Sequence, residues 1–231
     1  SMARISTADG PTITLATDIT TNIGIRSRDR VVAAHSHAER VRQEFERRSQ
    51  LLRACLSNED FLSNKGIGNE IGFHTFCYDP ALEFEARALF DTLARDAEAG
   101  KLPCTLKVVN LYDVVLSILD DLDVLEAMQE QEADFGSKAV LVDVVDYCQP
   151  DVVSDVVLDL TQPHVPGDAI LLVGVGEAYP FLRVHNLFDS MQSDFSDVPV
   201  IAAYPGTFNG SSVTLFNRLA AENYYRAIDI S

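Results

Sequence analysis

The sequence predicts an α/β fold in which a mainly parallel sheet of about five strands is flanked by helices and preceded by an N-terminal helical arm. Short apolar runs typical of buried strands alternate with longer amphipathic stretches typical of helices. A length of 231 residues and a hydrophobic content of 47% are sufficient for one large core. We therefore expect an arm or extension at residues 1–33 and a single α/β domain at residues 34–231.

The predicted fold is organised around the segment Ala169–Asn186. Its apolar run Ala169–Val173 follows a Pro-Gly-Asp turn signal and is typical of a strand buried on both faces. Gly174 and Gly176 come directly after this strand, and polar and aromatic residues follow them. In open α/β sheets, the groups at the carboxyl ends of buried strands form the working surface.

The N-terminal part of the chain predicts a polar arm followed by a helix. Residues 2–30 are rich in Thr, Ser, Asp and Arg, without sustained periodicity, so we expect an arm with a short strand as one candidate element. From about Arg30 to Ser57, apolar residues recur near helical spacing between arginines and glutamates. The charged face of this helix suits either solvent or a partner, and a homodimer through the arm is one expectation.

Two strand-to-helix steps with short connections predict parallel strands joined by right-handed crossovers. The first step is a strand at about Gly72–Tyr78, followed by a helix with Asp79 as its N-cap and Pro80 at its first position. The second step is a strand at Cys104–Asn110, followed directly by a helix that begins at Leu111.

Residues 123–147 are expected to be helical, with a break at Phe135-Gly136. Val140–Tyr147 is β-branched enough for a strand, but a buried strand would place its two aspartates on opposite faces, so we favour a helix. After an interruption at Pro150, residues 151–161 predict a short helix or turn.

The C-terminal third predicts a helix, two strands and a final turn or helix. The expected elements are a helix at 180–194, a buried strand at Pro199–Tyr204 that ends at the turn Pro205-Gly206, a hairpin signal at Asn209-Gly210, an edge strand at Val213–Phe216, and a helix or tight turn at Asn217–Ala227.

Polar or turn residues follow each of the four predicted parallel strands. Because the carboxyl ends of parallel strands meet at one edge of a sheet, we expect these residues to form a single rim that holds a partner or ligand. The candidate rim residues are Glu70, Asp79, Asn110, Glu177, Tyr179, Arg183, His185, Tyr204, Tyr225 and Arg226.

Each candidate also has a purely structural interpretation. Glu177 suits a general base or a magnesium ligand, and equally a helix cap or an ion pair. Arg183 suits a phosphate or carboxylate, or an ion pair with Glu177 or Asp79. His185 has no nucleophile motif beside it, and His74 lies within a predicted strand, so both are typical of structural histidines. The Tyr-Tyr-Arg string near the C-terminus is typical of an interface anchor or of core packing with a salt bridge.

The sequence contains no motif for nucleotide hydrolysis or for metal binding. No GxxxxGK[ST] string is present, and Gly66 and Gly68 precede a predicted strand, whereas the glycines of a dinucleotide fingerprint follow one. The four cysteines lie far apart, with no CxxC pair, so we expect reduced thiols and no zinc site. We therefore expect no catalytic residues, no cofactor and no metal.

The charge is strongly acidic and unevenly distributed. The formal net charge is −17; residues 1–56 carry nine arginines and six acids, and residues 57–231 carry nine basic and 29 acidic residues. This balance argues against nucleic-acid binding over most of the surface, and suits either solubility or a basic partner protein. No apolar run approaches the roughly 20 residues of a membrane span, and no signal-peptide pattern is present, so we expect a cytoplasmic location.

Five strings carry a family resemblance: FLSNKGIGNEIGFHTFCYDP, VVNLYDVVLSIL, LLVGVGEAYPFLRVHNL, PVIAAYPGTF and LFNRLAAENYYRAI. In this order, between Phe61 and Ile228, they resemble the BrxB family, a component of bacteriophage-exclusion (BREX) defence systems. The resemblance implies a cytoplasmic protein encoded beside a DNA methyltransferase, a large ATPase and an alkaline-phosphatase-like protein, with a role in assembling that machinery. It implies no catalytic residues, and residues 2–30 extend beyond the usual start of family members.

From the residues and the resemblance together, we expect a non-enzymatic adaptor of a phage-defence complex that binds the methyltransferase or the phosphatase-like component. Two alternatives remain open at this point. One is a degenerate nucleotide-binding domain that senses a ligand at the strand-end rim. The other is mimicry of DNA by the acidic side chains.

Overall fold

The computed structural model describes residues 17–64, 72–220, 222–223 and 227–231. Within these ranges, side chains are described from Ala33 onward, except those of residues 222–223. The chain divides into two compact units, residues 1–43 and residues 44–231. The expected division between residues 33 and 34 stays a prediction.

The first helix is longer than the sequence predicted. Helix α1 runs over Thr17–Cys55, so the described part of the expected polar arm is helical from Thr17 onward, and the candidate short strand is wrong there. Arg26, Arg28 and Arg30 are good helix formers, whereas residues 17–25 contain six β-branched residues, which favour a helix less. The short helix α2, Glu59–Leu62, follows and is capped by the side chain of Asn58.

The sheet has five parallel strands in the order β2-β3-β4-β1-β7, which confirms the predicted fold class. These strands are β1 (Phe73–Tyr78), β2 (Thr105–Asn110), β3 (Asp168–Val173), the first part of β4 (Val200–Phe208) and β7 (Ile228–Asp229). The central strands are apolar and buried because helices cover both of their faces.

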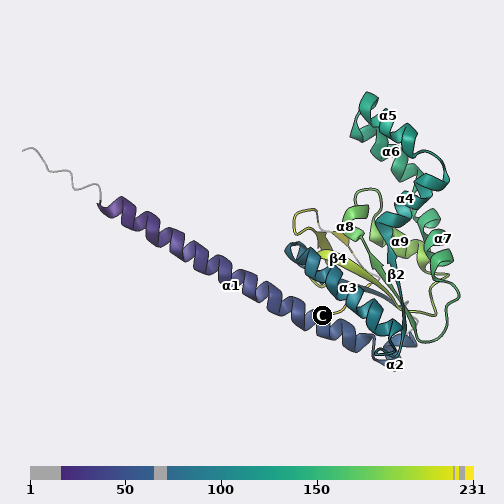
Figure 1. Cartoon of the computed structure of the whole chain (residues 1–231), viewed down its shortest axis with the longest axis horizontal. Coiled ribbons are helices and arrows are strands. Elements are labelled where there is room, and N and C mark those ends of the chain that lie inside the picture. The colour runs from purple at the N-terminus through teal and green to yellow at the C-terminus, as the bar shows by residue number, and fades with distance from the viewer. Residues whose placement is uncertain (1–16, 65–71, 221, 224–226) are drawn as a thin grey trace, which may run out of the picture. The chain divides into compact units, whose positions relative to one another are not determined.

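Helices cover the two faces of the sheet in separate layers, and their labels can be followed in Figure 1. One core contains Leu52 and Leu56 of α1, Phe90 and Leu93 of α3 (Glu83–Glu98), and side chains of β1, β3 and β4. The other core contains α4 (Leu111–Asp121), α7 (Pro150–Thr161), α8 (Val175–Ala178) and α9 (Val184–Met191). The described part of the domain is therefore a three-layer α/β/α arrangement.

The connection from β2 to β3 contains four helices. Between α4 and α7 lie α5 (Leu125–Phe135) and α6 (Ser137–Tyr147), with Gly136 at the junction, as the sequence predicted. Helices α5 and α6 pack on each other, and Figure 1 shows them side by side beyond α4.

Strand β4 corrects the expected turn at Pro205-Gly206. The strand continues through both residues to Phe208 and changes partner: Pro205 pairs in parallel with Tyr78 of β1, and Gly206 pairs antiparallel with Leu215 of β5 (Ser212–Leu215). Proline is tolerated because its missing N–H falls where the pairing changes. The predicted hairpin at Asn209-Gly210 is confirmed, since the Asn209 Oδ1 atom accepts hydrogen bonds from the Ser212 N–H and hydroxyl.

The C-terminal segment is extended where the sequence predicted a helix or tight turn. Residues 222–223 form the short strand β6 (Glu222–Asn223), which pairs with β5, so β5 is not an edge strand. Strand β7 then adds to β1. It is held by Arg48 of α1, whose Nη2 atom lies 2.6 and 2.7 Å from the two carboxylate oxygens of Asp229.

His74 of β1 is a structural histidine whose burial has a pH consequence. Burial lowers the pKa of His74 to about 4, and its ring lies 4.7 Å from that of Phe61. Because the unfolded chain takes up this proton at its ordinary pKa near 6.5, the contribution of His74 to stability is present above about pH 6.5 and is lost as the pH falls toward about 4.

We expect the free energy of unfolding to fall by up to roughly 3 kcal/mol between pH 6.5 and pH 4. Urea unfolding at several pH values measures this loss, and His74→Gln should flatten the curve in that window. A His74→Gln variant with the same pH dependence as the parent would contradict the assignment to His74.

Candidate functional site

Two capping residues lie at the carboxyl edge of the sheet; the sequence predicted the cap at Asp79 but not the one at Asn110. Asp79 follows β1, and its Oδ1 atom accepts a hydrogen bond from the Ala81 N–H at 2.9 Å, which caps the 3-10 turn η1 (Pro80–Leu82) before α3. Asn110 ends β2, and its Oδ1 atom accepts from the N–H groups of Tyr112 and Asp113 at the start of α4. Both residues fix the direction in which the chain leaves the sheet, so each has a structural role as a cap.

Gly174 is needed where β3 leaves the sheet beside the end of β2. It has a φ of +73°, and a Cβ atom built on it would lie 2.1 Å from the Oδ1 atom of Asn110. The left-handed backbone and the close approach each make a larger residue at this position destabilising. The glycine therefore allows the chain to leave β3 in close contact with Asn110 at the rim.

Glu177 of α8 forms an ion pair with Arg87 of α3, which also pairs with Glu83 at 2.8 Å. Helix α3 covers one face of the sheet and α8 covers the other, so this contact joins the two helical layers across the carboxyl edge. Glu177 therefore forms an ion pair, one of its two structural interpretations, but with Arg87, which the sequence did not predict as its partner. No local signal could have found Arg87, because it lies 90 residues away in the chain.

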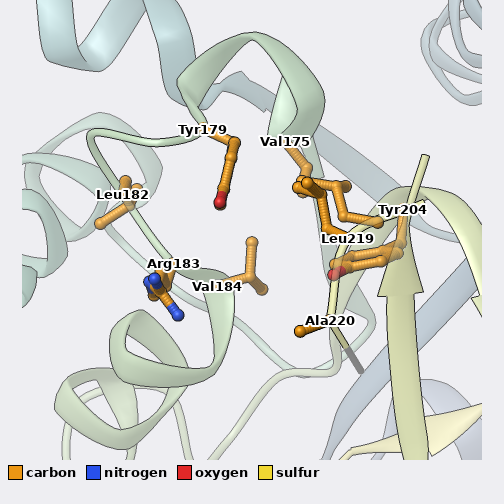
Figure 2. Close-up of a pocket in the computed structure, with 9 residues that line it drawn as sticks. Val175, Tyr179, Leu182, Arg183, Val184, Tyr204, Leu219 and Ala220 are labelled. Carbon is orange, nitrogen blue, oxygen red and sulfur yellow. The ribbon is translucent and has the colours of Figure 1, made fainter. Parts of the chain in front are cut away.

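Three candidate residues meet at a pocket beside this edge. Tyr179 lies after α8, Arg183 lies at the N-cap position of α9, and Tyr204 lies in β4; all three line a cavity of about 280 Å³. Figure 2 shows Tyr179 and Tyr204 on different sides of this cavity, with Val184 between them. The remaining lining residues are aliphatic: Val175, Leu182, Val184, Leu215, Leu219 and Ala220. We call this cavity the tyrosine–arginine pocket.

Helix α9 begins later than the predicted helix at 180–194, and the irregular segment before it lines the pocket. Helix α9 starts only at Val184, and residues 179–183 form an irregular segment that turns the chain beside β4. Arg183 is exposed, whereas Leu182 and Val184 on either side of it are buried. The segment therefore places one charged group at the mouth of an otherwise apolar and aromatic cavity.

The other candidates lie apart from the pocket or outside the described residues. His185 is half-buried in α9, and Asp79, Asn110 and Glu177 belong to the rim but do not line the cavity. The predicted residues Glu70, Tyr225 and Arg226 lie outside the described residues, as do Gly66 and Gly68.

A second cavity, of about 460 Å³, lies at the opposite edge of the sheet. Its lining includes Pro103 before β2, Pro166 and Gly167 before β3, and Glu59 as its one charged residue. Among the described residues, no group of three or more His, Cys, Asp or Glu side chains could hold a metal ion. No described helix combines the length and the apolar character needed to cross a membrane.

The four cysteines are free thiols, as the sequence predicted. Burial raises the pKa of Cys77 to about 12 and that of Cys148 to about 11, so both stay protonated near neutral pH. A thiol nucleophile requires the thiolate, and these two side chains are therefore packing groups.

Comparison with known proteins places the chain in a family. The family model described as "BREX protein BrxB" matches residues 107–230, which is more than half of the chain and includes the whole tyrosine–arginine pocket. The chain belongs to the BrxB family of BREX proteins. The resemblance seen in the sequence is thereby confirmed, and the α4–α7 helices also lie within the family region.

Two relatives are similar to this BrxB-family chain over most of its length. A BREX protein BrxB from Bacillus cereus (strain H3081.97) is 30% identical over 180 residues, which cover 76% of this chain and 91% of the relative. A BREX protein BrxB from Escherichia coli O9:H4 (strain HS) is 27% identical over 187 residues, which cover 79% of this chain and 90% of the relative. No solved structure matches the chain.

Proposed function

We propose that this BrxB-family chain is a non-enzymatic cytoplasmic adaptor that binds another BREX protein through its α4–α7 helices. The observation that carries the proposal is the composition of this segment. Residues 111–160 contain thirteen acidic residues and one basic residue, Lys138. Twelve of the thirteen acids are exposed, and the other, Asp143, accepts a hydrogen bond from Gln131 at 2.6 Å.

The same helices carry a concentration of exposed apolar side chains. Of the twelve large hydrophobic residues exposed in the described part of the chain, seven lie here: Leu116, Leu122, Phe135, Val142, Tyr147, Val152 and Leu160. Exposed apolar groups among charges of one sign are typical of a binding surface, because the charges attract the partner and the apolar groups stabilise the contact. We therefore expect a partner surface that is basic and partly apolar.

The resemblance to BREX components supplies the candidate partners. They are the methyltransferase and the alkaline-phosphatase-like protein encoded beside BrxB-family proteins. Either one would need a basic patch to match the α4–α7 surface, and such a patch could also bind DNA. Competition between this chain and DNA for the same patch would fit the proposal, because both ligands present negative charge.

The first test measures capture of the two candidate partners by the tagged full chain. It compares the parent with variants in which one exposed phenylalanine is changed. Phe135 at the end of α5 is 76% exposed, and Phe84 of α3 is 83% exposed. We expect Phe135→Ser to weaken binding at least about tenfold, as loss of an aromatic hot spot does. Phe84→Ser is the matched control and should bind normally, and both variants should keep the parent Tm because neither side chain is buried.

The second test separates local charge from total charge. Glu126→Gln, Glu130→Gln and Asp134→Asn neutralise three exposed acids of α5, and Glu85→Gln, Asp91→Asn and Glu98→Gln neutralise three exposed acids of α3. We expect only the α5 set to slow association, with the difference disappearing at high salt. Equal effects of the two sets, or no capture of either partner at low salt, would contradict the adaptor role.

A further inference from the structure

The tyrosine–arginine pocket has the shape and chemistry of a small-ligand site separate from the α4–α7 surface. Its lining residues come from the α8–α9 segment, β4, β5 and the residues that follow β5, and none lies between residues 111 and 160. A cavity of about 280 Å³ suits a compact ligand. The two proposals therefore stand or fall separately: failure of the adaptor proposal would not contradict ligand binding here, and absence of a ligand would not contradict the adaptor role.

The described lining of the pocket carries one positive side chain, in a strongly acidic protein. Among the nine described residues that line the pocket, Arg183 is the one with a charged side chain, and it is exposed. The amino end of α9 lies at the same place, because Arg183 is its N-cap residue and Val184 begins the helix. A guanidinium and a helix N-terminus both favour an anionic group. One guanidinium in an environment of net negative charge suits a single anion better than a polyphosphate.

The rest of the pocket suits a flat, mostly apolar body. The rings of Tyr179 and Tyr204 stand on different sides of the cavity, and their hydroxyls are the polar groups of its aromatic walls (Figure 2). Tyr204 is only 4% exposed, so its ring is fixed by the core and forms a rigid wall. Aromatic walls of this kind favour planar rings through stacking and edge contacts.

We propose that the tyrosine–arginine pocket binds a compact ligand in which one anionic group is attached to a flat ring system, with Arg183 holding the anion. A nucleoside monophosphate and an aromatic carboxylate share this chemistry. Binding is reversible and non-covalent, so the pocket would sense its ligand and would not transform it.

Calorimetry and thermal-shift assays on the full chain test this proposal with AMP, CMP, indole-3-acetate and ATP as probes. We expect at least one single-anion probe to raise the Tm by mass action, and ATP to bind more weakly than AMP. The AMP and indole-3-acetate arms distinguish a phosphate source from a carboxylate source. No binding by any single-anion probe at millimolar concentration would overturn the proposal, and tighter binding of ATP than of AMP would overturn its single-anion part.

Three variants locate the binding. Arg183→Gln should lower the affinity for the probe roughly tenfold, because it removes a charge-assisted contact. Leu219→Trp should abolish binding by filling the cavity from a half-buried position while leaving Arg183 in place. Arg47→Gln, at an exposed arginine on α1, is the control and should bind like the parent. Circular dichroism without ligand checks that each variant is folded, and unchanged binding in both pocket variants would overturn the assignment.

Discussion

Replacing Asp229 with alanine should lower the free energy of unfolding by roughly 3–5 kcal/mol, because the change leaves Arg48 buried without its carboxylate. The two side chains are 12% and 3% exposed, and the Thr75 hydroxyl also donates to Asp229 at 3.2 Å. Strand β7 is only two residues long, so this ion pair is a main attachment of the C-terminal strand to α1 and β1. Urea unfolding monitored by circular dichroism measures the loss.

A double variant distinguishes an unpaired charge from a lost strand. Arg48→Met with Asp229→Leu removes both charges and keeps similar volume, so it should recover much of the stability lost by Asp229→Ala alone. If the double variant were as unstable as the single one, the instability would come from detachment of β7 and not from the buried guanidinium.

Gly206→Ala should be almost as damaging, at a cost of at least about 3 kcal/mol from steric overlap. A Cβ atom on Gly206 would lie 2.1 Å from the carbonyl oxygen of Thr214, which is backbone and cannot rotate away. The two strands would have to separate where β4 changes from parallel to antiparallel pairing. The displacement would also reach Leu215, which lines the tyrosine–arginine pocket.

Thr207→Ala is the matched control for Gly206→Ala. Thr207 is the next residue of β4 and is exposed, so its truncation should change the free energy of unfolding by no more than about 0.5 kcal/mol. Urea unfolding of both variants gives the comparison. A Gly206→Ala protein as stable as the parent would show that β5 can shift without cost, contrary to the close strand pairing.

Local signals allowed most of the sheet to be predicted from the sequence. Asp79-Pro80 was recognised as a helix start because capping depends on residues within one turn. The break at Phe135-Gly136 and the hairpin at Asn209-Gly210 were also local, since each depends on a glycine in a short connection. The sequence therefore predicted those boundaries that depend on residues close together in the chain.

The errors arose where distant partners decide the structure. Pro205-Gly206 has the composition of a turn, yet pairing with β1 and β5 keeps it extended. Residues 222–223 were expected in a helix or tight turn, and pairing with β5 makes them a strand. The start of α1 at Thr17 was missed for a different reason, because its periodicity is weak before the arginine-rich part.

The candidate site was predicted in part. Tyr179, Arg183 and Tyr204 line one pocket, whereas Asp79, Asn110 and Glu177 at the strand ends do not. Leu215 and Leu219 were missed, because only the folded β4–β5 hairpin brings them to that edge. Arg87 was missed because an ion pair across the sheet leaves no trace in the sequence around Glu177.

The β2-to-β3 connection, with its four helices, is longer than the strand order requires. A crossover between adjacent parallel strands needs only about a dozen residues, usually with a single helix. Here α4 and α7 contact β2, whereas α5 and α6 form an added pair of helices within the same connection. If the α4–α7 helices bind another protein as proposed, substitutions or a change of length in the α5–α6 pair would alter that binding without disturbing the strand order. The same sheet would then carry different binding helices for partners whose surfaces differ.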